Sequence, residues 1–242
     1  QERGVFLASI ADDVTFLDSA GPTQSVTVTG NEGTGVRVAD GGVNATFTNG
    51  TYSNNGAGSQ FPGFNLVSFS GTVAFDGVTA SGNSDNGIEV NSSGVITLRN
   101  VTAENNTTVN EGDGAEIVSS TSLTVIGGSF SGNADSGIDV ESVPAVSLMS
   151  VAANDNGRDG FTFEGNVATQ SAVTVTGGTF SGNVRDGVHL STVADVTFTA
   201  NANAVLSSNG GDGIDIDDFS GTVTLRNLTA SGNIERGFVV AN

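Results

Sequence analysis

The sequence predicts an all-β solenoid, a coil of stacked turns built from short strands, and three observations lead to this fold. A motif of Gly followed by apolar–any–apolar residues occurs ten times in the 242 residues. From Gly35 to Gly237 it recurs with a mean spacing of about 25 residues, and self-similarity at a fixed period is typical of repeat architectures. Two further short segments in each period alternate apolar and polar residues, as half-buried strands do, whereas no segment has a useful helical period.

The Gly motif forms the first predicted strand of each turn, with its apolar residues inward and the residue between them outward. The segment 187–190 (GVHL) is one copy. Because parallel turns stack on one another, the outward residues of successive copies should form one column on the surface. That column reads Phe6, Arg37, Asn65, Glu89, Glu116, Asp139, Thr162, His189, Asp215 and Val239.

The second and third predicted strands also place apolar residues inward. Segments such as 173–175 (VTV) and 196–198 (VTF) supply the second strand, with Thr facing outward. In the third strand the inward pair is Val with Ala in some turns, as at 101–103, and Gly with an aromatic residue in others, as at 178–180. Small and large residues trade places, so each layer keeps a similar volume, as a dense core requires.

An Asn follows the third strand in every turn, at the corner before the next Gly motif. The column consists of Asn31, Asn55, Asn83, Asn106, Asn133, Asn156, Asn183, Asn209 and Asn233. Asn tolerates the left-handed backbone of a sharp turn, and stacked amides can bond along a column, so we interpret these residues as structural. Two of these corners carry four extra residues, within 56–62 and 107–113, and are the best candidates for loops that contact another molecule.

Three short strands per turn of about 25 residues resemble a right-handed parallel β-helix of the pectate-lyase-like superfamily, and the resemblance covers nearly the whole chain. It implies a single-stranded coil of about nine turns with three strands per turn. We therefore expect one domain over residues 1–242, either a self-stacking subunit or a segment of a longer protein. The resemblance predicts little about function, because one scaffold carries many unrelated activities.

The charge balance excludes some partners. Seven Arg and no Lys stand against 26 acidic residues, for a formal net charge of −19. This charge repels nucleic acid phosphates and an anionic membrane surface. No run of 18 apolar residues occurs, so no segment is expected to insert into a membrane. Cys is absent, which excludes disulfides and thiol chemistry.

The only histidine, His189, belongs to the outward column, and its neighbours on the adjoining turns are Thr162 and Asp215. A weak His–Asp pair is conceivable there, but nucleophilic catalysis needs an activated Ser and an oxyanion hole, and no GxSxG elbow occurs. We expect no catalytic residue and no required cofactor. Two carboxylates at a set separation suffice for a glycosidase, so glycosidase or polysaccharide lyase activity stays an open alternative.

Acidic residues are concentrated on the first-strand face and at the corner before it. Asp186, Asp212 and Asp215 are the candidate metal ligands, because carboxylates one turn apart can share a Ca²⁺ ion, which takes about six to eight oxygen ligands. The segment 210–218 (GGDGIDIDD) partly resembles a glycine-rich Ca²⁺-binding nonapeptide, although it occurs only once. The alternative is an acidic face that is simply solvated.

The array begins on one Gly motif (4–7) and ends on another (237–240), so its terminal turns are expected to expose strand edges and apolar side chains. We expect these ends to stack on a second copy or on an adjoining domain. The function that follows is structural or adhesive: a rigid, non-catalytic rod or filament subunit that is extracellular or on the cell surface. The alternatives are a carbohydrate-active β-helix, as a Ca²⁺-dependent polysaccharide lyase or a polysaccharide binder, and an ice-binding protein that uses the outward Thr columns.

Overall fold

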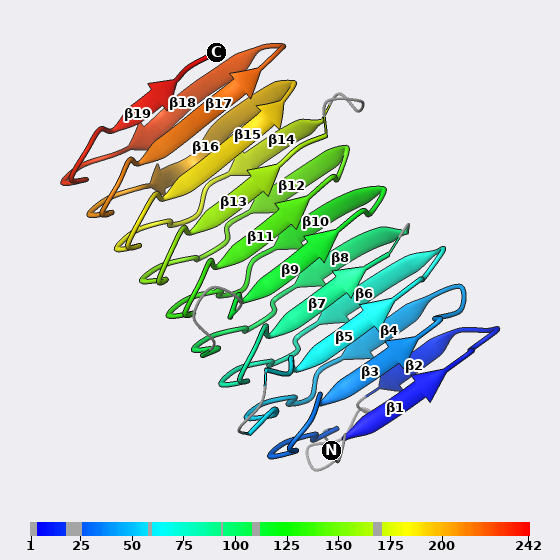
Figure 1. Cartoon of the computed structure of the whole chain (residues 1–242). Helices are drawn as coiled ribbons and strands as arrows, with labels where there is room; N and C mark the ends of the chain where they lie inside the picture. The colour runs from blue at the N-terminus through cyan, green and yellow to red at the C-terminus, as the bar shows by residue number, and fades with distance from the viewer. Residues whose placement is uncertain (1–3, 18–25, 58–59, 93, 108–111, 167–170) are drawn as a thin grey trace.

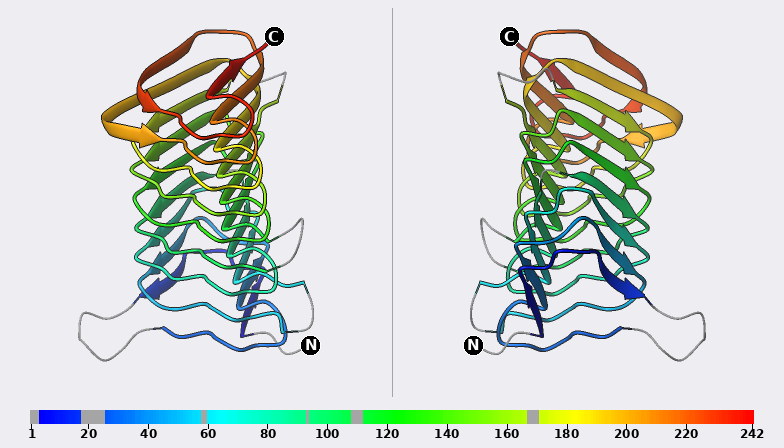
Figure 2. Two further views of the ribbon diagram at one scale, coloured as in Figure 1. Left: turned by 90° about the vertical axis from the view of Figure 1, so that its left-hand side faces the viewer. Right: turned by 90° about the vertical axis from the view of Figure 1, so that its right-hand side faces the viewer.

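The computed structural model describes residues 4–17, 26–57, 60–92, 94–107, 112–166 and 171–242, with the backbone alone at 200–203. The chain forms one column of stacked turns, with its two ends at opposite ends of the column (Figure 1, Figure 2). The expected all-β solenoid is therefore confirmed. Parts of both inserted corners, residues 58–59 and 108–111, lie outside the described residues. Within the described ranges, no helix is long and apolar enough to cross a membrane.

Sheet A is formed by the Gly motifs. It has ten parallel strands that follow one another in chain order, one from each motif. Its strands are β1 (Val5–Ala8), β3 (Val36–Ala39), β5 (Phe64–Val67), β7 (Ile88–Asn91), β9 (Ala115–Val118), β11 (Ile138–Glu141), β13 (Phe161–Glu164), β15 (Val188–Val193), β17 (Ile214–Phe219) and β19 (Phe238–Val240).

Sheet B is formed by the second predicted strand of each turn and has nine parallel strands, so the number of turns is close to the nine expected. Its strands are β2 (Val14–Leu17), β4 (Ala45–Thr48), β6 (Thr72–Asp76), β8 (Val95–Arg99), β10 (Ser122–Ile126), β12 (Ala145–Met149), β14 (Ala172–Thr176), β16 (Asp195–Val205) and β18 (Val223–Thr229). The outward Thr column predicted for this sheet is present, with Thr174 beside Thr197 and Thr197 beside Thr224.

The third side of most turns is shorter than the strand that the sequence predicts. One residue per turn makes an isolated parallel bridge, in the series Thr27, Thr51, Thr79, Thr102, Ser129, Ala152, Thr179 and Val205. The corners on either side explain this, because residues such as Asn100 and Asn105 both have positive φ and leave only a short extended segment between them. Near the C-terminal end this side joins sheet B, where β16 and β18 continue to Val205 and Thr229.

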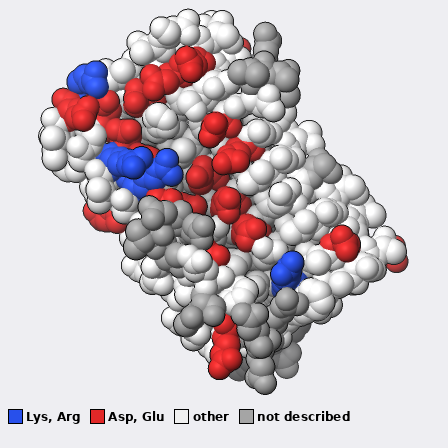
Figure 3. All heavy atoms as spheres, in the orientation of Figure 1, with Lys and Arg blue, Asp and Glu red and all other residues white. Residues whose placement is uncertain are grey.

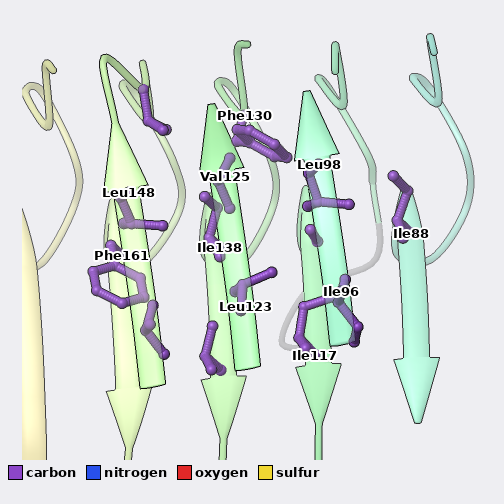
Figure 4. Close-up of a cluster of buried hydrophobic side chains, with 14 of the residues drawn as sticks. Ile88, Ile96, Leu98, Ile117, Leu123, Val125, Phe130, Ile138, Leu148 and Phe161 are labelled. Carbon is purple, nitrogen blue, oxygen red and sulfur yellow. The ribbon is translucent and has the colours of Figure 1, made fainter. Parts of the chain in front are cut away.

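Alternate residues of both sheets fill the interior of the column. In Figure 4, Phe161 from sheet A lies beside Leu148 from sheet B, and Ile138 from sheet A lies near Leu123 from sheet B. Earlier turns are packed with aromatic rings that surround Phe47. Phe47 stacks on Phe75 with ring centroids 4.9 Å apart and meets Phe64 edge-on at 4.9 Å. This continuous apolar core is what holds the outward columns in register.

The Gly–aromatic pairs of the third side are also confirmed, but volume is not the only reason why glycine is needed there. Phe130 and Phe180 are fully buried, as predicted. Gly178 has a φ of 110°, and a Cβ at this position would lie 2.5 Å from the carbonyl oxygen of Val151 on the preceding turn. Backbone conformation and close approach of two turns therefore require glycine here, beyond the need for a small residue beside Phe180.

The Asn column is a buried ladder of hydrogen bonds, which confirms its structural role. Asn133 donates its backbone N–H and its side-chain amide to Asn156 Oδ1 at 3.0 Å and 3.2 Å, and the same pair of bonds links each turn from Asn31 to Asn233. The left-handed backbone expected at these Asn residues lies one position earlier, as at Asn105 with φ 55° and Gly132 with φ 68°. The ladder thus serves to satisfy buried polar groups rather than to form the turn.

Candidate functional site

The outward column of sheet A has the register that the sequence predicts. Cα partners join Glu89 to Glu116, Glu116 to Asp139, Thr162 to His189, and His189 to Asp215. In Figure 3, Asp and Glu side chains gather in a band along this side of the molecule. We call the outward side chains of β7 to β17, together with the corner carboxylates before these strands, the acidic face.

The corner carboxylates form a second column, directly before the Gly motifs. The backbone N–H of Asp186 donates to Asp159 Oδ1 at 2.7 Å, and that of Asp212 donates to Asp186 Oδ1 at 2.5 Å. Asp113 Oδ1 accepts the N–H of Ser136 in the same way, at 2.7 Å. Each carboxylate therefore satisfies a backbone N–H of the following turn through one oxygen and keeps its second oxygen for other contacts.

Carboxyl groups on neighbouring turns raise one another's pKa in the middle of the acidic face. Burial, reinforced by the charges of Glu89 and Asp139, raises the pKa of Glu116 to about 7. Burial, followed by the charge of Glu141, raises the pKa of Asp139 to about 6. A Glu116 oxygen also accepts a hydrogen bond from Asn86 Nδ2 at 2.7 Å, which holds the side chain in place. These carboxyl groups are partly protonated near neutral pH.

Asp113 is also buried, at 4% exposed. Burial, then the charges of Asp139 and Asp135, raises its pKa well above the usual range. Sequence analysis did not single out Asp113, because it lies at the end of an inserted corner. Its position directly before Gly114, the same position that Asp159, Asp186 and Asp212 hold before their own Gly residues, was the signal that could have identified it.

An arginine neutralises part of the acidic face one turn further along. Arg158 Nη1 lies 3.7 Å from Asp135 Oδ2, and its Nε lies 3.5 Å from Asp159 Oδ2. Asp159 Oδ2 also accepts a hydrogen bond from Thr162 Oγ1 at 3.3 Å. The Arg158 guanidinium thus bridges two carboxylates on successive turns, those of Asp135 and Asp159. It also offers further N–H donors at the surface.

His189 lies between two carboxylates rather than one. Its Nδ1 is 3.5 Å from Asp215 Oδ2, on the next turn, and 3.9 Å from Asp186 Oδ2, at the corner before β15. The sequence predicts Asp215 as a neighbour on the next turn, and Asp186, three residues before His189 in the chain, reaches the imidazole from the corner. The imidazole is also less exposed than predicted, with 29% of its side-chain surface accessible, because the two carboxylates flank it. One donor atom from each of the three residues lies within 4.8 Å of the others.

Of the three predicted metal ligands, the structure brings Asp186 and Asp215 together and turns Asp212 elsewhere. Asp212 Oδ1 lies 3.3 Å from Arg236 Nε in an ion pair, and the Asp212 side chain is largely buried. A surface pocket of about 330 Å³ is lined by all three carboxylates and by Arg236. Burial is the main cause that raises the pKa of Asp186 to about 6, and the charges of Asp159 and Asp215 act in the same direction.

Comparisons with known proteins agree with this architecture. The family model for a right handed β-helix region matches residues 23–203, about three quarters of the chain. Among solved structures, the crystal structure of pectate lyase Pel9A is similar with a TM-score of 0.46 and 16% sequence identity, over 93% of this chain and 69% of that one. No curated protein matches the sequence. The chain therefore belongs to the right-handed β-helix family.

Proposed function

We propose that the protein is a carbohydrate-active β-helix that binds a polysaccharide along its acidic face. The observation that supports this best is the outward column of sheet A from Asn65 to Asp215, in which every turn has a hydrogen-bonding side chain and only Thr162, at 7% exposed, is buried. Successive turns are about 4.8 Å apart. A linear polymer lying along the column would therefore meet polar groups on most turns, and its contacts would add up along the chain.

The protonation of the column suits sugar hydroxyls, which both donate and accept hydrogen bonds. A carboxyl group with a pKa of about 7, such as that of Glu116, is about half protonated at neutral pH and can donate as well as accept. Asn65 Nδ2 donates to Glu89 Oε2 at 2.5 Å, so neighbouring members of the column are already oriented before a ligand arrives. Such preorganisation lowers the entropic cost of binding.

The charge of the molecule selects among polysaccharides. With a net charge of −19, the protein should bind neutral chains directly and repel anionic ones unless a divalent cation lies between them. Asp186, Asp212 and Asp215 are the residues that we propose for that role if the cation is Ca²⁺. We also propose an extracellular or cell-surface location, where structural polysaccharides occur.

The test is calorimetric titration with neutral and anionic polysaccharides, the latter with and without Ca²⁺, while products are assayed for new reducing ends and for unsaturated sugars. We expect Glu116→Ala with Asp139→Ala to weaken binding about tenfold or more, the loss of two hydrogen-bonding groups. The matched control is Asp76→Ala, an exposed carboxylate on the outward side of sheet B. Binding that is unaffected by the double variant, or weakened equally by the control, would contradict the proposal.

Product formation separates an enzyme from a binding protein. If the chain hydrolyses a glycan, one carboxyl group must act as an acid and a second carboxylate as a base or nucleophile. Glu116 is the candidate acid because burial and neighbouring charges raise its pKa to about 7. Turnover that is abolished in Glu116→Gln while binding persists would establish hydrolysis. Binding without turnover would establish a non-catalytic polysaccharide binder.

A structural or adhesive rod is the second candidate, and the Asn ladder favours it because the ladder stiffens every turn. The inward side chains of β19 add support. Phe238 and Val240 occupy the positions of Ile214 and Ile216 on the preceding turn, yet they are 42% and 44% exposed. If the molecules stack end to end, a turn of a second copy would cover them. Filaments seen by electron microscopy, and lost in Phe238→Asp with Val240→Asp, would support this function; a monomer at all concentrations would contradict self-stacking.

A further inference from the structure

We propose that Asp186, His189 and Asp215 bind a transition-metal ion, with Zn²⁺ as the best match, and this proposal does not depend on polysaccharide binding. The fold brings the three residues together from separate places. His189 and Asp215 are Cα partners on adjacent strands, β15 and β17. Asp186 lies at the corner before β15, three residues before His189. Their donor atoms converge within 4.8 Å of one another.

The separations between these atoms fit a metal ion better than direct contact. His189 Nδ1 is 3.5 Å from Asp215 Oδ2 and 3.9 Å from Asp186 Oδ2, which is longer than a hydrogen bond. In a tetrahedral Zn²⁺ site, bonds of about 2.0–2.2 Å place neighbouring donor atoms about 3.3–3.6 Å apart. The two distances to the imidazole lie close to this range, and the two carboxylate oxygens, which are within 4.8 Å of each other, would move toward one another around an ion.

The ladder of corner carboxylates holds Asp186 ready for this role. Its Oδ1 accepts the backbone N–H of Asp212 at 2.5 Å, while its own N–H donates to Asp159 Oδ1 at 2.7 Å. The carboxylate is thus fixed through one oxygen, and the other oxygen is the one nearest His189. A hydrogen bond to the second oxygen of a ligating carboxylate is the outer-shell arrangement that orients metal ligands in proteins.

Arg236 makes its ion pairs outside the triangle. Its Nε is 3.3 Å from Asp212 Oδ1, and its Nη2 is 3.2 Å from Glu235 Oε2. Among the described residues, no arginine forms an ion pair with the carboxylate of Asp186 or Asp215. The pocket lined by Asp186, Asp212 and Asp215 opens beside them and gives an ion access from solvent, with room for a water molecule as the fourth ligand.

The donor set selects the class of metal. Ca²⁺ takes about six to eight oxygen ligands, whereas an imidazole nitrogen with two carboxylate oxygens suits Zn²⁺ and neighbouring transition metals. This assignment differs from the Ca²⁺ site with Asp212 that the sequence predicts, because it takes His189 as the third ligand, while Asp212 is paired with Arg236. Three protein ligands and an open position also describe a site that can exchange ligands, rather than a closed structural one.

The experiment is calorimetric titration of the chelator-treated full chain with Zn²⁺, alone and in the presence of excess Ca²⁺. The chain has one histidine, so the imidazole signals in a ¹H–¹⁵N NMR spectrum report on His189 alone. We expect one Zn²⁺ per chain, a shift of these signals on binding, and about tenfold or greater weakening in His189→Gln and in Asp215→Asn. Both residues lie on the outward side of their strands, and unfolding curves will verify that the variants stay folded.

Glu141→Gln is the matched control, because it removes one charge from the acidic face at an exposed position on β11. It should leave Zn²⁺ affinity within about threefold of the starting value, the change that loss of one screened surface charge produces. Equal Zn²⁺ affinity in His189→Gln and the control would overturn the proposal. The proposal would also be overturned if Ca²⁺ displaced Zn²⁺ and His189→Gln left the Zn²⁺ affinity unchanged. That result would establish a site made of oxygen ligands alone. Neither result would bear on polysaccharide binding by Glu116 and Asp139.

Discussion

Asn133 donates two hydrogen bonds to a single atom, Asn156 Oδ1, at 3.0 Å from its backbone nitrogen and 3.2 Å from its side-chain nitrogen. At the same time its own Oδ1 accepts the equivalent pair from Asn106. Each side chain in the column therefore serves two neighbouring turns. Because these groups are buried, no water can replace a lost partner, and the ladder is sensitive to any break.

Asn133→Ala should destabilise the protein by about 2–5 kcal/mol, because it leaves the backbone and side-chain donors of Asn106 without their acceptor. Chemical denaturation measures the change. Asn91→Ala is the control, since Asn91 is exposed at the end of β7, and it should alter the free energy of unfolding by no more than about 0.5 kcal/mol. Equal effects of the two variants would show that the ladder is not a source of stability.

Gly178→Ala should be strongly destabilising. The φ of 110° is costly for any residue with a Cβ, and the new Cβ would lie 2.5 Å from the Val151 carbonyl oxygen, which belongs to backbone and cannot turn away. Gly30 also has a positive φ, 68°, but a Cβ there would meet no atom within 4 Å. Gly30→Ala should thus cost about 1–2 kcal/mol, and Gly178→Ala should cost more than this in the same unfolding assay. A smaller cost for Gly178→Ala would mean that the turns can separate there.

Stability should fall as the pH rises from about 4 to about 7. In the folded chain burial raises the pKa of Glu116 from 4.5 to about 7 and that of Asp139 from 3.8 to about 6. Between the unfolded and folded values the folded chain holds protons that the unfolded chain has released, so the free energy of unfolding decreases with rising pH. The contribution is fully present below the unfolded values and is lost once the pH exceeds the folded ones.

Thermal unfolding across this pH range tests the effect. Glu116→Gln should flatten the dependence, because the amide does not titrate, and it should raise the unfolding temperature most at the high-pH end. A change of 1 kcal/mol corresponds to about 2–4 °C for a chain of this size. Asp76→Asn removes an exposed carboxylate on sheet B and should leave the slope unchanged. A rise in stability with pH over the same interval would contradict the assigned burial of these groups.

Phe47→Ala should cost about 3–5 kcal/mol, the range for removal of a fully buried aromatic side chain. Phe47 is 0% exposed and contacts four rings, those of Phe16, Tyr52, Phe64 and Phe75. Phe6→Ala is the comparison, because Phe6 is 48% exposed on the outward side of β1, and it should cost about 1 kcal/mol or less. A similar loss of stability in both variants would show that Phe47 does not belong to the core of these turns.

The alternation of residues was sufficient to predict most of this fold. Side chains in a strand point alternately to opposite faces, so the Gly motifs determined which residues, such as Val188 and Leu190, lie inward and which, such as His189, lie outward. The repeat spacing then determined that His189 lies beside Thr162 and Asp215, because parallel turns stack copy on copy. Both relationships are present in the structure.

Backbone conformation was harder to predict. The sequence predicts that Gly178 and Phe180 are paired to keep the volume of each layer similar. The structure shows that the backbone of Gly178 also lies close to the carbonyl oxygen of Val151. The third predicted strand is reduced to single bridges for a related reason. Positive φ values at neighbouring corners, such as Asn100 and Asn105, shorten the extended segment between them. The strand propensity of the residues in that segment does not predict the shortening.

The architecture and the surface columns can therefore be predicted from the sequence, because both follow from a period of about 25 residues and an alternation of two. The contacts of side chains across columns become clear only in three dimensions. Asp186 approaches His189 because its other oxygen is held by the N–H of Asp212, and Asp212 turns to Arg236 instead. Such contacts depend on the path of each corner and on side-chain rotamers, which repeat spacing does not specify.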